Sequence, residues 1–338
     1  MDAEKIGKLI QYLRKRLGYT QHELANRLSV SDKAVSKWER GMGIPDISLL
    51  QKLSVILDVD IDSLLSGEVS LHDQIWKGAL YLDEYATSML YDKLVFDYLL
   101  SYFLLCRVKD ILVWANESQV DILKNQYRNG DLLGINIDFR VKRNEKTICD
   151  EIIYAKDYYG NSNIMMLNGS CVIYGVDLSR FLCRGLINPN TFSILTYVSN
   201  DFQNSVYFNE ELKLSYSDDR SIKTNYIYSM LPILFVKNGV KALSMYQGKD
   251  FFNLVNQLIK NEGLAAEIMD KGYVSYSIDS EDALLDASLF IKLVQKNTKC
   301  IVSCLEEIAY RRGLISIEFL KAVSDPGKKN YLAQTFGF

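Results

Sequence analysis

The segment that most constrains the fold lies near the N-terminus, where two helix starts are separated by almost no connecting chain. Thr20 and Glu23 occupy the positions of a capping box, so a helix begins directly after Thr20. Ser31 is placed to cap a second helix, and Gly41 is placed to end it. The connection at residues 29–30 is too short for a strand, so the sequence predicts two short helices joined by a tight turn.

Helical signals continue on both sides of this pair and predict an all-helical domain of residues 1–68. Apolar residues recur at helical spacing in the first turns of the chain, at Ile6, Ile10, Leu13 and Leu17, and Gly18 is placed to close that helix. Pro45 interrupts the chain before two further helical stretches, DISLLQKLSVILDV and DIDSLLSG. The pattern predicts five short helices with a tight link between the second and the third, which is a helix-turn-helix plan.

Residues 4–66 resemble the Cro/C1-type helix-turn-helix family of bacterial and phage repressors, and the run TQHELANRLSVSDKAVSKWERG carries the resemblance. In that family the helix after the turn enters the major groove of double-stranded DNA. The resemblance implies that this helix presents to base edges Ser31, Asp32, Lys33, Ser36 and Lys37. It also implies contacts to the DNA backbone from Gln21, Arg40 and Lys8, while Ala34, Val35 and Trp38 face the core.

The charge distribution agrees with a polyanion-binding module at the N-terminus. Residues 1–40 contain nine basic and five acidic side chains, a net charge of +4. Because the whole chain carries −3, the remaining residues carry −7. A basic segment on an acidic body favours DNA as a partner. The alternative is a small helical bundle with a solvated charged surface, used for dimerisation or for binding a protein partner.

Composition indicates an ordinary globular protein of the cytoplasm. The chain of 338 residues is 48% apolar and 24% charged, and it has no apolar run of the ~20 residues that a membrane span needs. No signal peptide is expected. Six cysteines are scattered without a CxxC pair, and there are only two histidines, so we expect reduced thiols, no metal site and no cofactor.

After a short linker, residues 74–338 change to strands that alternate with helices. Strand candidates include WKGALYL, DILVWAN and INIDFRVK, and helix candidates include VFDYLLSYFLLCRV and ESQVDILKNQYRNGD. The stretches TFSILTYVS and SVYFNEELKLSYS are interpreted as antiparallel strands. The alternation predicts an α/β domain with a mainly parallel sheet and helices on both of its faces.

The stretch NIMMLNGSCVIYG, residues 163–175, raises a question about chemistry. An apolar strand ends in the small turn Asn168-Gly169-Ser170, and the chain then resumes with a second apolar run. The end of a buried parallel strand is where α/β enzymes often place a carboxylate that holds a metal or activates a substrate. This turn carries no acidic side chain.

The second part of the chain is similar to glucose-1-phosphate thymidylyltransferases. The similar stretches are YDKLVFDYLL, DILVWANESQVDILKNQY, IYGVDL and EDALLDASLFIKLVQKNTKCIVSCLEEIAYRRGLIS. They follow in the same order through residues 76–335. The resemblance implies a nucleotidyltransferase-like, Rossmann-like α/β fold for this domain.

The resemblance also implies catalytic parts that this chain lacks. The family uses a glycine-rich loop and a Lys for the phosphates, and two Asp residues for Mg²⁺. Here the glycine-rich segment is missing, and Tyr85 falls near the Lys position. Ser170 and Ser277 take the two Asp positions, and the sugar-phosphate segment aligns with Tyr216, Ser217 and Asp218. We therefore expect a pseudoenzyme without catalytic residues, because charge neutralisation supplies most of phosphoryl-transfer catalysis.

One further site is implied by the same resemblance. Many of these enzymes bind a nucleotide sugar at a subunit interface for feedback inhibition. The corresponding residues here are Tyr174, Gly175, Lys271, Glu307, Ile308 and Arg311. Arg311 offers a planar donor fork for a diphosphate. The alternative is that these residues only hold an oligomer interface.

These interpretations combine into one hypothesis with two rivals. The chain is expected to be a transcription regulator whose body forms a homo-oligomer, a dimer or tetramer, and senses a nucleotide sugar such as a dTDP-sugar. The first rival is an active sugar-phosphate nucleotidyltransferase with a DNA-binding head. The second rival is a regulatory partner subunit of a genuine thymidylyltransferase.

Overall fold

The computed structural model of the chain describes residues 2–16, 19–57, 61–66, 76–199, 205–208, 214–216, 227–269, 272–323 and 326–337. The chain divides into two compact units, residues 1–74 with 311–313 and residues 75–310 with 314–338. We call residues 1–74 the head and residues 75–338 the body. The expected boundary between residues 68 and 74 falls in 67–75, outside the described residues.

The described residues of the head form five helices, α1 (Ala3–Arg16), α2 (Gln21–Leu28), α3 (Asp32–Glu39), α4 (Ile47–Leu57) and α5 (Ile61–Ser66). The predicted capping box begins α2. The Thr20 hydroxyl accepts a hydrogen bond from the Glu23 N–H at 3.1 Å, and the Glu23 carboxylate accepts one from the Thr20 N–H at 2.7 Å. Ser31 caps α3 by accepting from the Ala34 N–H. Both predicted helix starts are confirmed.

The head folds around one apolar cluster. Its buried members are Ile6, Leu9, Ile10, Leu13, Leu24, Ala25, Leu28, Val35, Trp38, Leu50, Leu53, Leu57 and Leu64. The inward positions predicted for α3 are confirmed, with Val35 and Trp38 buried and Ala34 partly buried against the cluster. Leu17 and Gly18 lie outside the described residues. Helices α1 and α3 approach closely because Gly7 has no side chain, and a Cβ there would lie 2.1 Å from the Trp38 carbonyl oxygen.

The body is built on one mixed sheet, of nine strands in the described residues. Its parallel part runs in the order β5 (Asn136–Val141), β4 (Asp110–Ala115), β1 (Trp76–Tyr81) and β6 (Asn163–Asn168). The long strand β11 (Ile227–Val236) lies antiparallel to β6 and carries the rest of the sheet. That rest comprises β8 (Phe192–Ser199), β9 (Ser205–Phe208), β10 (Leu214–Tyr216) and β12 (Leu264–Met269). The α/β class is confirmed. The sheet is mixed and not mainly parallel, because β11 pairs antiparallel with β6, β8 and β9, while β12 pairs parallel with β8.

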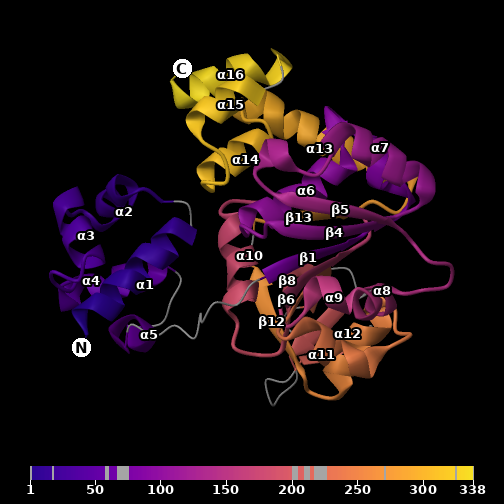
Figure 1. The fold of residues 1–338 in the computed structure, drawn as a ribbon, viewed down its shortest axis with the longest axis horizontal. Coiled ribbons are helices and arrows are strands. Elements are labelled where there is room, and N and C mark those ends of the chain that lie inside the picture. The colour runs from indigo at the N-terminus through magenta and orange to yellow at the C-terminus, as the bar shows by residue number, and fades with distance from the viewer. Residues whose placement is uncertain are drawn as a thin grey trace. The chain divides into compact units, whose positions relative to one another are not determined.

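Helices cover both faces of this sheet, as the sequence predicts (Figure 1). One apolar layer includes Leu80 of β1 and three helices, α6 (Val95–Leu105), α7 (Glu117–Tyr127) and α10 (Leu178–Ile187). The opposite layer includes Ala79 and four helices, α8 (Ile148–Tyr154), α9 (Lys156–Tyr159), α11 (Gly239–Leu243) and α12 (Phe251–Lys260). Neighbouring residues of β1 enter opposite layers because successive side chains of a strand point to opposite faces.

Shorter elements surround these layers. Strand β7 (Cys171–Tyr174) pairs with β13 (Val274–Ser277), and β2 (Met89–Leu90) pairs with β3 (Lys93–Leu94) after the short helix η1 (Glu84–Thr87). The chain continues through α13 (Glu281–Thr298), α14 (Leu305–Arg311), α15 (Ile317–Val323) and α16 (Pro326–Phe336). Two further short turns of helix are η2 (Asp131–Leu133) and η3 (Ser244–Tyr246). In the described part of the chain, no helix combines the length and apolarity that crossing a membrane requires.

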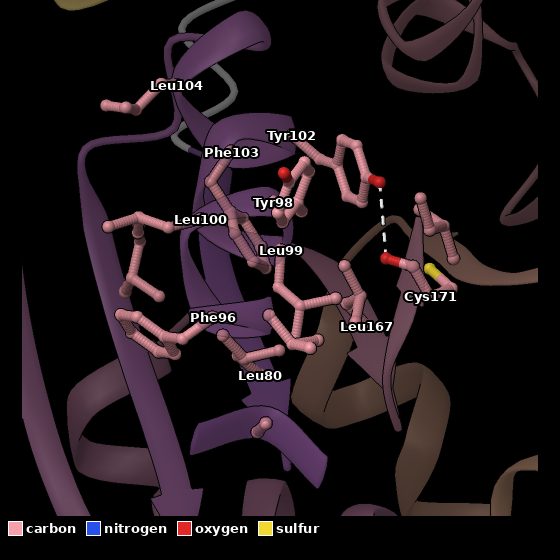
Figure 2. Packing of buried hydrophobic residues seen from close by; sticks show 14 of the residues in the cluster. Leu80, Phe96, Tyr98, Leu99, Leu100, Tyr102, Phe103, Leu104, Leu167 and Cys171 are labelled. Atoms are coloured by element: carbon pink, nitrogen blue, oxygen red, sulfur yellow. Dashed lines mark hydrogen bonds between the residues drawn. The ribbon is translucent and has the colours of Figure 1, made fainter. Parts of the chain in front are cut away.

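A buried tyrosine ties helix α6 to the strand that follows the turn at Ser170. Figure 2 shows the Tyr102 hydroxyl pointing from α6 toward β7. It donates to the Cys171 carbonyl oxygen at 3.3 Å and accepts from the Ile173 N–H at 2.8 Å. Complete burial raises the pKa of Tyr102 well above its usual value, so the hydroxyl stays neutral and keeps both bonds. These two bonds hold β7 against α6.

Candidate functional site

The outward side of α3 in the head carries most of the residues predicted to contact DNA bases. Ser31, Asp32, Lys33 and Lys37 are exposed, and Ser36 is half-buried. Arg40, predicted to contact the DNA backbone, is also exposed, and its Nε donates to the Ser36 carbonyl oxygen at 3.1 Å. Val35 and Trp38 anchor the opposite side of the helix in the core. The structure therefore groups these predicted residues on one surface of one short helix.

The residues of this surface differ in how strongly they are already engaged. The Asp32 carboxylate lies 2.9 Å from Nδ1 of His22 on α2, and Nε2 of His22 lies 3.0 Å from the amide nitrogen of Asn26. By contrast, Lys33 and Lys37 form no ion pair with any residue that the structure describes. The two lysines are therefore available to an incoming anion.

Gln21 lies inward of this surface, in a buried polar cluster that the sequence did not reveal. Its amide donates to the Glu39 carboxylate at 2.7 Å. The Arg14 guanidinium of α1 donates two hydrogen bonds to the same carboxylate, from Nε at 2.5 Å and from Nη2 at 2.9 Å. Burial alone would raise the pKa of Glu39, but the bonds from Arg14 and Gln21 and the charge of Arg14 hold the pKa below its usual value. The ionised cluster joins the first three helices at the base of α3.

In the body, a carboxylate does lie beside the turn after β6, and it comes from the chain that follows β1. The Ser170 hydroxyl donates to the carboxylate of Asp83, which lies two residues beyond the end of β1. The same carboxylate oxygen of Asp83 accepts from the Tyr85 N–H at 3.0 Å. Ser170 itself is buried, with 4% of its surface exposed. The strand-end position therefore holds a closed hydroxyl–carboxylate pair.

A lysine from a third strand end completes this group. Lys142 follows β5, its ammonium donates to the Leu82 carbonyl oxygen, and it lies 4.0 Å from the centre of the Tyr81 ring. Burial lowers the pKa of Lys142, although the negative charge of Asp83 acts in the opposite direction. Gln119 of α7 donates to the Asp83 carbonyl oxygen at 2.6 Å. The polar groups at these strand ends thus bond to one another and to the backbone.

The two positions at which the resemblance implies metal-binding acids are neighbours in the structure. Ser277 ends β13 opposite Cys171, and the Ile278 N–H donates to the Ser170 carbonyl oxygen at 2.9 Å. Ser280 caps α13, and Asp282 lies in its first turn. Among the residues that the structure describes, no three His, Cys, Asp or Glu side chains form a group that could hold a metal ion.

The residues predicted for a nucleotide-sugar site lie on several elements of the body. Tyr174 at the end of β7 packs edge-on against Phe290 of α13, with ring centres 5.6 Å apart. Gly175 lies against the Tyr273 ring, which leaves no space for a side chain. Glu307 of α14 accepts a hydrogen bond from the Tyr331 hydroxyl of α16 at 2.5 Å. Tyr174 and Glu307 are therefore each engaged within the body, by different partners.

The other members of that predicted site have less definite surroundings. Ile308 is partly buried against the larger apolar cluster of the body, and Arg311 is exposed at the end of α14. Lys271 lies outside the described residues, as do Ser217 and Asp218 of the predicted sugar-phosphate segment.

Sequence reasoning missed Asp83, Lys142 and Gln119 at the strand ends, and it missed the inward role of Arg14 and Glu39 in the head. A signal for Asp83 was present, since an acid directly after a parallel strand lies at the edge where ligands bind in such sheets. Lys142 has the same placement after β5.

Comparison with known proteins separates the same two parts of the chain. Residues 10–64 match the family model described as helix-turn-helix. A stretch of 59 residues is 48% identical to the HTH-type transcriptional activator BcrR of Enterococcus faecalis, which covers 18% of this chain and 29% of that protein. The head is a Cro/C1-type helix-turn-helix domain.

The body is similar to proteins of another kind. It is 23% identical over 253 residues to the glucose-1-phosphate thymidylyltransferase of Neisseria meningitidis, across 72% of this chain and 88% of that enzyme. The enzyme of Mycolicibacterium smegmatis is 24% identical over 262 residues, across 72% and 89%. A crystal structure described as a glucose-1-phosphate thymidylyltransferase from Bacillus anthracis with sucrose superposes with a TM-score of 0.54 at 12% identity, across 64% and 94%. The body therefore has the fold of these enzymes.

Proposed function

We propose that this chain, a Cro/C1-type helix-turn-helix head on a thymidylyltransferase-like body, is a sequence-specific DNA-binding transcription regulator of the cytoplasm. The observation that carries the proposal is the surface of α3, on which Lys33 and Lys37 are exposed and make no ion pair within the described part of the chain. The helix bearing them is fixed at both ends, by the Ser31 cap and by the buried Glu39. A rigid helix with outward cations suits insertion into the major groove.

In this proposal the residues of the head divide into two roles. Lys33, Ser36 and Lys37 read base edges, together with Asp32 once it leaves His22. Arg40 and Lys8 contact phosphates and set the register of the head on the duplex. Gln21 acts mainly through Glu39, because its amide already bonds to that carboxylate at 2.7 Å. Its part in DNA binding is therefore to hold the base of α3.

The body in this proposal does not transfer nucleotides. Transfer between phosphates requires positive groups that neutralise the developing charge. At the strand ends the Lys142 ammonium already bonds to the Leu82 carbonyl oxygen, and Asp83 accepts from Ser170. The chain also passes from β1 to α6 through η1 and one small hairpin, in residues 82–94, without a glycine-rich loop. These features support a pseudoenzyme.

The finer part of the proposal is that the body assembles copies of the chain and senses a nucleotide sugar. A dimer or tetramer would present two heads to a palindromic operator. Tyr174, Gly175, Glu307, Ile308 and Arg311 would receive the ligand, for example a dTDP-sugar, with Arg311 on the diphosphate. A ligand that bonds to Glu307 would compete with the Tyr331 hydroxyl for this carboxylate. Ligand binding would then favour an arrangement of the body in which the Glu307–Tyr331 bond is broken over one in which it is kept.

The test of DNA binding uses the full chain. Purified protein is incubated with a pool of random duplexes, bound sequences are enriched, and affinity for the enriched duplex is measured by fluorescence anisotropy. We expect enrichment of one sequence by the wild type and none by Lys33→Ala/Lys37→Ala. Lys124→Ala/Lys260→Ala is the matched control, because it removes the same charge from exposed positions on α7 and α12. Failure of the wild type to enrich any sequence contradicts the proposal.

A second experiment addresses the body. Melting curves are recorded with nucleoside triphosphates, sugar phosphates and dTDP-sugars, each with and without Mg²⁺. A ligand at 100 times its dissociation constant adds about 2.7 kcal/mol to the free energy of unfolding. We expect a shift with a dTDP-sugar that does not depend on Mg²⁺ and that Arg311→Ala abolishes.

One observation favours a second function, an active nucleotidyltransferase, since Asp83 does bring a carboxylate to the strand ends. Release of pyrophosphate from dTTP and glucose 1-phosphate with Mg²⁺ tests it directly. We expect none from this chain under conditions in which a bacterial thymidylyltransferase turns over. Measured release that Asp83→Asn removes would replace the pseudoenzyme proposal.

A further inference from the structure

Helix α13 of the body carries an apolar row that no described residue covers. Ala287 and Ile291 face inward and are fully buried. Leu285, Leu289 and Leu293 face outward, with 58%, 50% and 57% of their surface exposed. Residues four apart lie on one side of a helix, so the three leucines form one continuous row. Single exposed leucines are common on protein surfaces, whereas an exposed row of three marks an interaction site.

The charges at the ends of this row are arranged symmetrically about its centre. Asp282 precedes Leu289 by seven residues and Lys296 follows it by seven, and both side chains are exposed. Seven residues make almost two helical turns, so Asp282 and Lys296 lie on the same side of α13 as Leu289. The row therefore runs from an acid, through three leucines, to a base.

This order specifies what fits against it. A second α13 laid antiparallel, with Leu289 against Leu289 of the partner subunit, places Leu285 beside the partner subunit's Leu293. The same arrangement places Asp282 beside Lys296 of the partner subunit at one end, and the reverse pair at the other end. A parallel arrangement would place acid against acid and base against base, which costs free energy. The row is complementary to itself in one orientation only.

We propose that α13 is the interface through which two copies of this chain pair, antiparallel about a twofold axis at Leu289. The inference deepens the proposed function and rests on it for its purpose, since a twofold body pair would carry two heads. Strand β2 packs against α13 and bears Met89, which is 58% exposed, so apolar surface borders the helix and widens the interface. The interface is isologous, because each copy contributes the same surface.

The first test measures the assembly of the full chain by sedimentation equilibrium. We expect a wild-type dimer at micromolar concentration and a dissociation constant at least ~100-fold higher for Leu289→Asp, which corresponds to about 2.7 kcal/mol. Ile122→Asp is the matched control, because Ile122 is 47% exposed on α7 and lies outside the proposed interface. Since both residues are exposed, both variants are expected to melt cooperatively, which circular dichroism checks.

Charge exchange tests the orientation independently of folding. Asp282→Lys alone places two lysines together at each end of the interface, and Lys296→Asp alone places two acids together. Each single variant is expected to raise the dissociation constant ~10-fold. The double variant Asp282→Lys/Lys296→Asp is expected to return it to within about threefold of the wild type, because the pairs re-form with opposite polarity.

The outcomes separate this inference from the proposed function. Three results would each overturn the α13 interface. The first is a wild type that remains monomeric at roughly 50–100 μM. The others are a dimer that Leu289→Asp leaves intact and a double variant that shows no rescue. None of these results bears on whether the head binds DNA. A dimer that behaves as stated but enriches no duplex overturns the proposed function and leaves the interface standing.

Discussion

The outward surface of α3 and the strand ends of the body both carry polar side chains at positions where related folds bind phosphate-containing partners. They differ in what those side chains already hold. Lys33 and Lys37 make no ion pair within the described residues, whereas Lys142 and Ser170 bond to Leu82 and Asp83. A polar group must exchange a bond to bind a ligand, and the net gain is small when the existing bond is buried.

This difference concerns what each polar group already binds, and not only where the group lies in the fold. The strand ends contain an acid, a base and a hydroxyl within one group, which could be read as a catalytic set. Each of these groups already has a partner, because Ser170 donates to Asp83 and Lys142 donates to the Leu82 carbonyl oxygen. The surface of α3 has simpler chemistry, but its cations face solvent and are available.

The largest effect is expected from the buried ion pair between Arg14 and Glu39, which joins α1 to the C-terminal end of α3. Arg14→Ala leaves the Glu39 carboxylate buried without its cation, since only 1% of the Glu39 side chain is exposed. We expect the head to lose 3 to ~5 kcal/mol of its free energy of unfolding and with it the DNA-binding surface. Denaturation followed by Trp38 fluorescence, in a chain with Trp76 and Trp114 replaced by Phe, measures the loss. A change below ~1 kcal/mol would contradict the role of the pair.

The same pair gives the head a pH dependence with a defined sign. Arg14 and Gln21 hold the pKa of Glu39 below its ordinary value of 4.5, so the folded state favours the ionised form. The resulting stability is present above pH 4.5 and is lost as the pH falls through the lowered pKa. Arg14→Ala is expected to flatten this part of the stability profile, which distinguishes loss of the ion pair from a loss of packing.

The next effect tests whether the cations of α3 are available to DNA. Lys33→Glu is expected to weaken binding to the enriched duplex ~100-fold, or about 2.7 kcal/mol, through lost attraction and new repulsion of phosphates. Lys124→Glu makes the same change of charge on α7 of the body and should alter affinity less than ~2-fold. Equal effects of the two variants would show that net charge, and not the α3 surface, governs binding.

A smaller effect is expected from returning an acid to the strand end. Ser170→Asp removes the donor to Asp83 and places two carboxylates together, so we expect a loss of about 2 kcal/mol in stability at pH 7. One of the two acids then has a raised pKa, and the deficit should shrink below about pH 5. Stability is measured by urea denaturation across that range.

The control for this variant is Asp83→Asn/Ser170→Asp, in which the new acid meets an amide that can donate. It should recover most of the lost stability. If Ser170→Asp is instead stabilised by Mg²⁺ and releases pyrophosphate from dTTP and glucose 1-phosphate, the strand ends are a latent active site and the contrast with α3 fails.

The smallest effect concerns the tyrosine that positions β7. Tyr102→Phe leaves the Ile173 N–H without its partner in the interior, and we expect a cost of about 1.5 kcal/mol. Tyr159→Phe, on the opposite face of the sheet, removes one donor to the Gly78 carbonyl oxygen and should cost less, about 0.5 kcal/mol. Chemical denaturation of both variants decides the order, and the reverse order would contradict the role given to Tyr102.

The contrast also explains what could be predicted from the sequence. The caps at Thr20 and Ser31 and the spacing of Ile6, Ile10 and Leu13 are local signals, so the helices of the head were predictable. The Asp83–Ser170 bond joins residues 87 positions apart and depends on the pairing of β1 with β6. No local pattern encodes that pairing, so the turn at Ser170 was interpreted without its acid.

Charge counting had a similar limit in the head. Arg14 and Glu39 were counted among the nine basic and five acidic side chains of residues 1–40. Their opposite charges cancel in the net charge of +4, but the count does not show that the two side chains are buried against each other. Strand β11 was also missed. It pairs antiparallel with β6, β8 and β9, so its ten residues connect the parallel strands β5, β4, β1 and β6 to the rest of the sheet. Its role follows from contacts with distant strands, which its own sequence does not specify.

The hydroxyl–carboxylate bond between Ser170 and Asp83 has a consequence for the history of such a body. If an ancestor carried an acid at position 170, the present pair makes reversion by a single substitution unfavourable, because the restored acid meets Asp83. Recovery of the ancestral state then needs at least two changes, with an unstable intermediate between them. In a chain with this pair, the cost in fold stability alone therefore opposes an acid at position 170.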